Sequence, residues 1–177
     1  MRRRSQTRLS VLGALATEPA TGYGVRSAII ETLGHFWHES FGQIYPTLTA
    51  LEAEGLVKRD KEGRFAITSR GRAELSAMLA EEPEPQLPRN GLLLRLFFAA
   101  HLPKGRALAL VDAAAASARR KLAELEAVER VIVAEGRAES ALWRATVRYG
   151  VLHAKATIAW ADETRQLFTQ RSSPSRG

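Results

Sequence analysis

Gln43 and Thr47 lie four residues apart in a stretch whose apolar residues repeat at helical spacing. On a helix, such a pair shares one face. The side-chain amide of Gln forms two hydrogen bonds with adenine, and Thr offers its methyl group to thymine or its hydroxyl to a base or phosphate. The next segment adds cations suited to phosphate oxygens, namely Lys58, Arg59, Lys61 and Arg64. These residue types in this order predict contacts with a nucleic-acid duplex.

The helix that would carry Gln43 and Thr47 is defined by its apolar stripe. Three apolar residues follow i, i+4, i+7 spacing and should face inward, namely Ile44, Leu48 and Leu51. Ser40 and Gln43 form an S-x-x-Q capping box that starts the helix, and Gly55 ends it. Ser40 and the free amides of the helix start can also hold a phosphate. The alternative is that Gln43 only caps the helix and that Thr47 is only a solvated residue.

The surrounding elements match the plan of a winged helix-turn-helix domain. Besides that helix, the apolar spacing predicts three more, at 6–16, 22–33 and 69–79. A hairpin, or wing, precedes the last of them, with strands at 56–59 and 64–67. In such domains the third helix enters the major groove, and Lys and Arg of the wing contact phosphates. An ordinary solvated hairpin is the alternative for this wing.

Residues 81–88, with three Pro and three Glu, mark a linker between two domains. We expect a DNA-binding domain at 1–80, a helical domain at 89–170 and a disordered tail at 171–177. The helical domain is predicted to contain helices at 91–101, 104–135 and 138–169. The first of these is apolar almost all round, which favours burial on more than one side. The predicted fold class is therefore mainly α with a small β-hairpin wing.

The two long C-terminal helices carry apolar residues in a coiled-coil-like repeat. On the first helix they recur every seven residues, and on the second they follow spacings of three and four. We predict that these seams form a homodimer through Val111, Ala118, Leu122, Leu125, Ile132, Val151 and Ile158. The alternative is an internal helical hairpin.

The composition excludes several kinds of chemistry. The 177 residues are 45% hydrophobic and 25% charged, which is typical of a globular protein, and they contain no Cys. Disulfides and thiol catalysis are therefore excluded. The formal net charge of +7 favours polyanionic partners. The longest apolar run, Leu92–Leu102, is too short to span a bilayer, and we expect a cytoplasmic protein.

No group of residues has the spacing of a catalytic, cofactor or metal site, and we expect neither an enzyme nor a cofactor. His35 and His38 with Glu39 could ligate a metal, but they lie in a connector without a third ligand at fixed spacing. A second set of cations could contact phosphates, namely Arg2, Arg3, Arg4 and Arg8. Aromatic residues of the helical domain could stack on a small-molecule effector, namely Phe97, Trp143, Tyr149 and Trp160. The alternative is that these four belong to the core.

Three segments resemble the PadR family of transcriptional regulators. They are GYGV at 22–25, FWHESFGQIYPTLTALEAEGLV at 36–57 and FAITSRGRAEL at 65–75. The middle segment has the family's residue at every specified position, whereas Phe65 stands where Tyr is commoner. The C-terminal part is similar to the family only in its long helices.

The resemblance implies a dimeric winged-helix protein that binds double-stranded operator DNA, usually as a repressor relieved by a small molecule. It places six residues in the recognition-helix motif, namely Ser40, Gly42, Gln43, Tyr45, Pro46 and Thr47. We expect Pro46 in the first helical turn. Tyr45 either reaches a phosphate with its hydroxyl or packs under the wing. Tyr23 is expected in the core. The alternative function is a ligand- or protein-binding winged-helix dimer with weak, incidental DNA affinity.

Overall fold

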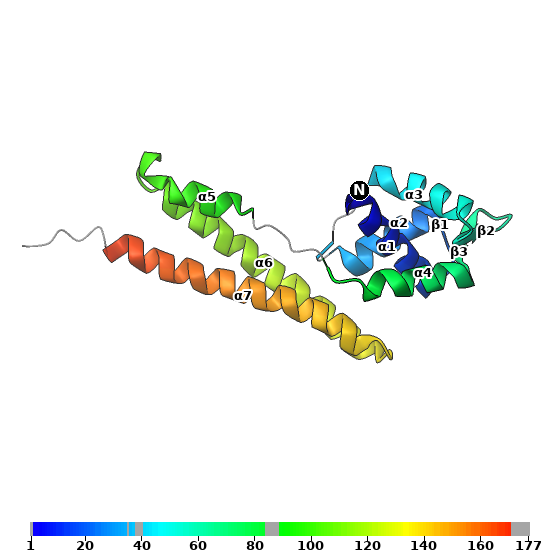
Figure 1. Ribbon diagram of the computed structural model, residues 1–177. Coiled ribbons are helices and arrows are strands. Elements are labelled where there is room, and N and C mark those ends of the chain that lie inside the picture. Colours follow the sequence, from blue (N-terminus) through cyan, green and yellow to red (C-terminus); the bar gives the residue numbers. More distant parts are fainter. Residues whose placement is uncertain (1, 35, 38–40, 84–88, 171–177) are drawn as a thin grey trace, which may run out of the picture. The chain divides into compact units, whose positions relative to one another are not determined.

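The computed structural model describes residues 2–34, 36–37, 41–83 and 89–170. The chain divides into two compact units, Met1–Pro85 and Gln86–Gly177, and each is described by itself. Both units are mainly helical, as predicted (Figure 1). Within the described residues, no helix is both long enough and apolar enough to cross a membrane.

The N-terminal unit combines helices with three short strands. In chain order these are α1 (Arg2–Thr17), β1 (Ala20–Thr21), α2 (Gly22–Leu33), α3 (Phe41–Ala53), β2 (Val57–Arg59), β3 (Arg64–Ile67) and α4 (Ser69–Ala80). The helices and the hairpin confirm the predicted order, and α2 has both of its predicted ends. The sequence did not predict β1, because two residues carry no detectable periodicity.

The three strands form one antiparallel sheet in the order β1-β3-β2. The paired residues are Ala20 with Phe65, Thr21 with Arg64, Val57 with Ile67, Lys58 with Ala66, and Arg59 with Phe65. Opposite residues of an antiparallel pair lie on the same face of a sheet. Val57, Phe65 and Ile67 are buried, so their face is the core face. Lys58 therefore lies on the opposite, outer face.

One apolar core holds this unit together. It is built from inward-facing residues of α1, α2, α3 and the wing, namely Val11, Leu12, Leu15, Val25, Ile29, Ile44, Leu48, Leu51, Leu56, Val57, Phe65 and Ile67. The predicted stripe of α3 is at most 1% exposed at each of its three positions. Its burial fixes the rotation of α3 about its axis, because burying such a side chain is worth about 1.5–3 kcal/mol.

Thr68 joins the wing to α4. Its Oγ1 lies 2.9 Å and 3.1 Å from the carbonyl oxygens of Gly55 and Leu56, and it accepts a hydrogen bond from the Gly71 amide at 3.0 Å. The Thr68 amide also donates to the Leu56 carbonyl at 3.0 Å. A Cβ on Gly71 would lie 2.0 Å from that carbonyl oxygen. Thr68 therefore caps α4, while Gly71 allows the helix to approach the start of the wing.

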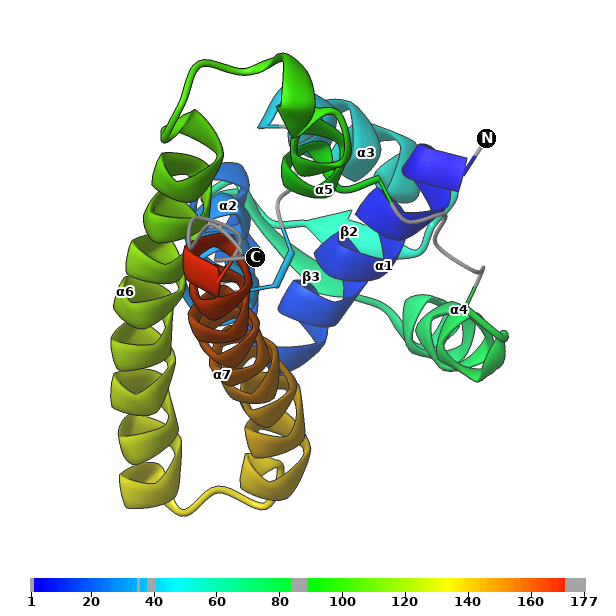
Figure 2. The same ribbon diagram turned by 90° about the vertical axis from the view of Figure 1, so that its left-hand side faces the viewer.

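The C-terminal unit is a long helical hairpin with a short helix packed on it. Its elements are α5 (Gly91–Phe97), the 3-10 helix η1 (Ala99–His101), α6 (Arg106–Glu135) and α7 (Ser140–Gln170). Helices α6 and α7 run side by side in opposite directions (Figures 1 and 2). The chain reverses just after α6 at Gly136, whose φ of 59° favours glycine.

The seam of this hairpin contains the residues that we expected to contact a second subunit. Four of the seven are buried within the single chain, namely Val111, Ala118, Leu125 and Val151. The other three are half-buried, namely Leu122, Ile132 and Ile158. The prediction that this seam faces a partner is therefore wrong for the buried residues. The two helices of one chain cover each other's seams, which is the alternative of an internal hairpin.

The apolar surface of α5 also differs from the prediction. Leu96 packs against the cluster of Val111, Ala115 and Ala161 in the hairpin. Four other large apolar side chains of this segment are at least half exposed, namely Leu93, Leu94, Phe97 and Phe98. Burial on more than one side is therefore wrong for the single chain, because the hairpin covers only one side of this short helix.

Candidate nucleic-acid interface

Helix α3 presents the residues that we predicted to meet base edges. Gln43 is exposed and Thr47 is half-buried. On the helix, Gln43 therefore faces solvent beside the buried stripe, whereas Thr47 lies at the edge between that stripe and the solvent. Ser40 lies outside the described residues, as do His35, His38 and Glu39. Within the described residues, the buried stripe of Ile44, Leu48 and Leu51 sets the orientation of α3.

Pro46 lies deeper in the helix than the sequence suggested. It is the sixth residue of the described α3, beyond the first turn, so the expected position is wrong. A proline has no amide hydrogen, and the helix therefore supplies no i+4 donor for the Gly42 carbonyl. Gly42 and Pro46 are both exposed.

The wing holds its four cations in two different ways. Arg59 lies over the ring of Phe65, with its Cζ 5.3 Å from the ring centre. The Arg64 guanidinium donates to the Pro19 carbonyl at 2.9 Å, which ties β3 to the segment before β1. Lys58 and Lys61 are exposed and make no hydrogen bond or ion pair with the described residues. Their ammonium groups are therefore the wing cations most accessible to phosphate.

The turn of the wing is ordered by short-range hydrogen bonds. The Asp60 carboxylate accepts a hydrogen bond from the Arg64 amide at 2.7 Å, and the Gly63 amide donates to the Asp60 carbonyl at 3.2 Å. Gly63 has a φ of 79°, which other residues rarely adopt. The position of Lys61 is thereby fixed by the backbone of a closed turn.

Arg8, which we grouped with the N-terminal phosphate candidates, is engaged elsewhere. Its guanidinium donates two hydrogen bonds of 2.7 Å to the two carboxylate oxygens of Glu54. The hydrogen bond with Arg8 lowers the pKa of Glu54, and the same contact raises the pKa of Arg8. Arg8 therefore links α1 to the residue that follows α3, and a role as a free phosphate ligand is wrong for it.

Two tyrosines of this unit lie at its surface. Tyr45 keeps 56% of its surface exposed, and its ring lies against Gly22 at the start of α2. Tyr23 is 65% exposed, with the Arg26 guanidinium 6.0 Å from its ring centre, so its predicted place in the core is wrong. The sequence marks Gly22 as a break between two helices, but no local pattern indicates its contact with Tyr45.

The four aromatic residues proposed for effector binding differ in their surroundings. Trp160 is half-buried and packs against the Val111 cluster, as expected for a core residue. Phe97 is 83% exposed and Tyr149 is 74% exposed. Trp143 is half-buried, and the Arg137 guanidinium lies 5.7 Å from its ring centre.

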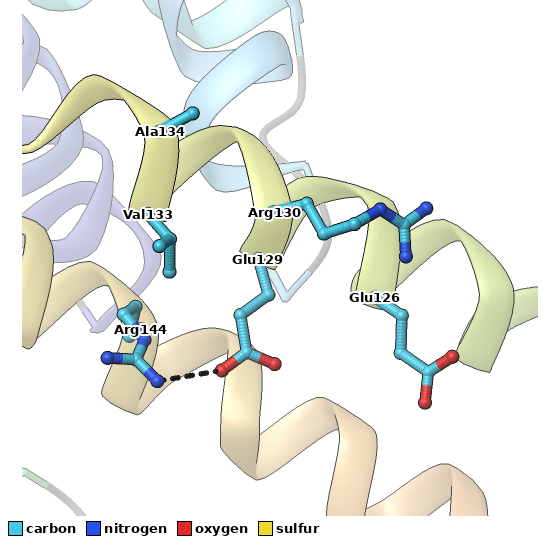
Figure 3. A pocket seen from close by; sticks show the side chains of 6 residues that line it. All are labelled: Glu126, Glu129, Arg130, Val133, Ala134 and Arg144. Carbon is cyan, nitrogen blue, oxygen red and sulfur yellow. Dashed lines mark hydrogen bonds and ion pairs between the residues drawn. The ribbon is translucent and has the colours of Figure 1, made fainter.

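A shallow cavity of about 450 Å³ lies elsewhere on the hairpin, toward the end of α6. It is lined by Glu126, Glu129, Arg130, Val133, Ala134 and Arg144. Figure 3 shows the Arg144 guanidinium reaching the Glu129 carboxylate, at 3.4 Å. The aromatic candidates are not among the lining residues, so this cavity and the predicted effector set are different sites.

A helix-turn-helix core with a basic wing, followed by a long helical hairpin, defines a class of winged-helix regulators. Residues 11–77 match the model of the transcriptional regulator PadR-like family. Residues 88–169 match the model named virulence activator alpha C-term. The chain therefore carries a PadR-like family domain in residues 11–77 and is similar to curated PadR-type transcriptional regulators.

Individual relatives agree with this assignment. The negative transcriptional regulator PadR of Bacillus subtilis is 28% identical over 127 residues, which cover 66% of this chain and 69% of the relative. The structure of the PadR-like regulator BC1756 from Bacillus cereus has a TM-score of 0.79 at 22% identity and covers 94% of this chain and 99% of its own. The virulence activator AphA of Vibrio cholerae has a TM-score of 0.77 at 24% identity, with the same coverage.

Two further structures show B. subtilis PadR with ligands. One is a complex with operator DNA, with a TM-score of 0.78, 22% identity and coverage of 90% of this chain and 97% of the solved one. The other is a complex with p-coumaric acid, with a TM-score of 0.79, 22% identity and coverage of 90% and 96%.

Proposed function

We propose that this transcriptional regulator binds operator DNA as a dimer, acts as a repressor, and is released by a small-molecule effector. The observation that carries the proposal is the outward side of α3. The exposed amide of Gln43 and the hydroxyl of Thr47 stand on a helix that the core holds in place. The wing follows closely in sequence, and its Lys58 and Lys61 make no ion pair with the described residues. The B. subtilis relative solved with operator DNA has the same fold, which supports this use of the surface.

The side chains of α3 and of the wing suit different parts of the duplex. Gln43 and Thr47 are suited to base edges, because each can donate and accept hydrogen bonds in the major groove. Lys58 and Lys61 carry charge on flexible chains and suit phosphate oxygens, which carry no sequence information. Specificity is therefore assigned to α3, and most of the salt dependence to the wing.

Fluorescence anisotropy on labelled DNA tests this assignment. The duplex comes from upstream of the protein's own gene, and a scrambled duplex of equal length is the control. Titrations at several salt concentrations give the affinity and its salt slope. A preference of about 10³ or more for the native duplex would place the protein among specific regulators. Equal, weak and steeply salt-dependent binding of both duplexes would contradict the proposal and favour a binding module with incidental DNA affinity.

Two kinds of variant separate the roles. Gln43→Ala should weaken operator binding by about 1–3 kcal/mol and relax the base preference at one position. Lys61→Ala should weaken binding to all duplexes similarly and reduce the salt slope by about 1. Lys104→Ala removes an exposed lysine from the C-terminal unit and is the matched control for lost charge. If Gln43→Ala weakened both duplexes equally, its assignment to base recognition would be wrong.

The dimer is assigned to the outer surface of the hairpin, not to its seam. Leu142, Tyr149 and Leu152 of α7 lie at i, i+7 and i+10 and are each more than half exposed. This is the spacing of a second heptad stripe. Together with the exposed side chains of α5, it leaves several large apolar side chains on the surface of the hairpin. A second copy of the chain is the occupant that a two-fold operator requires, because it supplies the second α3.

Analytical ultracentrifugation tests the stripe. Tyr149→Glu and Leu152→Glu should shift the protein toward monomer, because a buried carboxylate without a partner is unfavourable. Leu79→Glu is the control, since Leu79 is 64% exposed on α4 of the other unit. If the α7 variants remained dimeric, the interface would lie elsewhere.

Release by an effector is tested in the same anisotropy assay. p-Coumaric acid, the ligand in one structure of the B. subtilis relative, is the first compound to titrate into the protein–operator complex. In a Trp37→Phe variant, the fluorescence of Trp143 and Trp160 reports binding to the C-terminal unit independently of DNA. Binding that quenches tryptophan without releasing DNA would argue against this compound as the effector.

A further inference from the structure

Gly22 begins α2 directly after β1 and lies against the ring of Tyr45 in α3. A Cβ at Gly22 would stand 2.5 Å from Cε1 of that ring, 3.0 Å from Cζ and 3.1 Å from Cδ1. Gly22 is buried, and its φ is not among the positive values. The local backbone therefore does not require glycine. The absence of a side chain is required by the space that the Tyr45 ring occupies.

We propose that Gly22 is a positioning residue for DNA recognition, because it lets the Tyr45 ring lie close against the start of α2 and so fixes the ring's exposed side toward the duplex. This inference rests on the proposed function. Tyr45 stands between Gln43 and Thr47 in sequence and keeps 56% of its surface exposed. Its inner side is held by Gly22, and the rest of the side chain remains free for a ligand.

The start of α2 is itself well anchored. Thr21 precedes Gly22 and pairs with Arg64 in the sheet, and the Arg64 guanidinium donates to the Pro19 carbonyl at 2.9 Å. Thr21 Oγ1 also accepts a hydrogen bond from the Gly24 amide at 3.1 Å. Gly22 therefore moves with the wing, and the contact with Tyr45 couples the ring on α3 to the wing cations.

The coupling has a direct chemical consequence. A Tyr hydroxyl can donate a hydrogen bond to a phosphate oxygen, but only if it is at the right distance when α3 is in the groove. A methyl group at Gly22 would push the ring outward by more than a hydrogen bond tolerates. Because the ring is more than half exposed, it can swing away without disrupting the core. The expected defect is therefore in DNA binding and not in folding.

A double-mutant cycle on the full chain tests the inference. Gly22→Ala should weaken operator binding about ten-fold, within the range of a lost DNA contact, and leave the melting temperature nearly unchanged. In a Tyr45→Ala background the same substitution should change the affinity less than two-fold, because the clashing ring is gone. Gly13→Ala in α1 is the matched control, since a Cβ there meets nothing within 4 Å. It should leave operator affinity unchanged.

Three results of the double-mutant cycle would overturn the inference. They are an unchanged affinity in Gly22→Ala, an equal loss in the wild-type and Tyr45→Ala backgrounds, and a large fall in melting temperature that accounts for the lost binding.

Nuclear magnetic resonance tests the contact between Gly22 and Tyr45 without DNA. The Gly22 Hα protons should show a ring-current shift that disappears in Tyr45→Ala, and its absence would also overturn the inference. If the wild-type protein failed to bind operator DNA, the proposed function would fall, while the ring-current result would still decide whether the contact exists.

Discussion

Replacing Gly71 with alanine should destabilise the N-terminal unit more than replacing Gly13 or Gly22. A Cβ at this position would lie 2.0 Å from the Leu56 carbonyl oxygen and 2.8 Å from Cγ1 of Ile67. The carbonyl cannot move freely, because it already accepts a hydrogen bond from the Thr68 amide. Ile67 is likewise only 9% exposed. Either the helix or the start of the wing must shift.

The magnitude follows from three opposing contributions. Overpacking a core position costs about 1–3 kcal/mol. Displacing the Leu56 carbonyl weakens the cap at Thr68, which costs about 1 kcal/mol. The higher helix propensity of alanine returns at most about 1 kcal/mol. The net loss is therefore about 2 kcal/mol. For a unit of this size, that lowers the melting temperature by about 8–16 °C.

Thermal melts and hydrogen–deuterium exchange of the full chain measure this change. Exchange should increase in peptides covering β2, β3 and α4, and remain unchanged in α6 and α7. Gly13→Ala is again the control and should keep or slightly raise the melting temperature, because its Cβ meets no neighbour. A Gly71→Ala protein with unchanged stability and unchanged exchange in the wing would refute the steric argument.

Two further predictions concern a buried leucine and an ion pair. Leu125→Ala should cost about 2–5 kcal/mol in urea denaturation. Adding Gly150→Ala, whose Cβ would lie 2.8 Å from Leu125 Cδ1 in the native hairpin, should then recover part of that loss. Arg8 lowers the pKa of Glu54 in the folded protein. The ion pair should therefore add roughly 0.2–1 kcal/mol to the free energy of unfolding at pH values above the pKa that Glu54 has in the unfolded chain. This contribution should be lost as the pH falls through the pKa of Glu54 in the folded protein. The stability difference between wild type and Glu54→Gln should therefore shrink between about pH 5 and pH 3.

Much of the candidate DNA-binding surface could be predicted from local sequence. The spacing of Ile44, Leu48 and Leu51 fixes one buried side of α3, and the outward position of Gln43 follows from it. Likewise, the alternation of apolar residues in β3 predicts the buried positions of Phe65 and Ile67. These predictions succeed because the side that a residue faces depends on helical or strand periodicity within a few positions.

Contacts between distant segments could not be predicted in this way. Gly22 and Tyr45 are 23 positions apart, and no local pattern indicates that one supports the other. The ion pair of Arg8 with Glu54 spans 46 positions. An arginine in a basic N-terminal segment looks the same in sequence whether it meets a phosphate or a carboxylate of its own chain. Only the packing of α1 against α3 decides between them.

The pairing of α6 with α7 could have been predicted from the length of the segment that connects them. A heptad seam is satisfied equally well by a second chain or by a neighbouring helix of the same chain. Only four residues separate α6 from α7, and so short a connection forces the helices to pack against each other as an antiparallel pair. Intrachain packing therefore occupies Leu125 and Val151 before any association. What remains for a partner is the other side of α7, where Leu142, Tyr149 and Leu152 repeat at heptad spacing, out of phase with the buried seam.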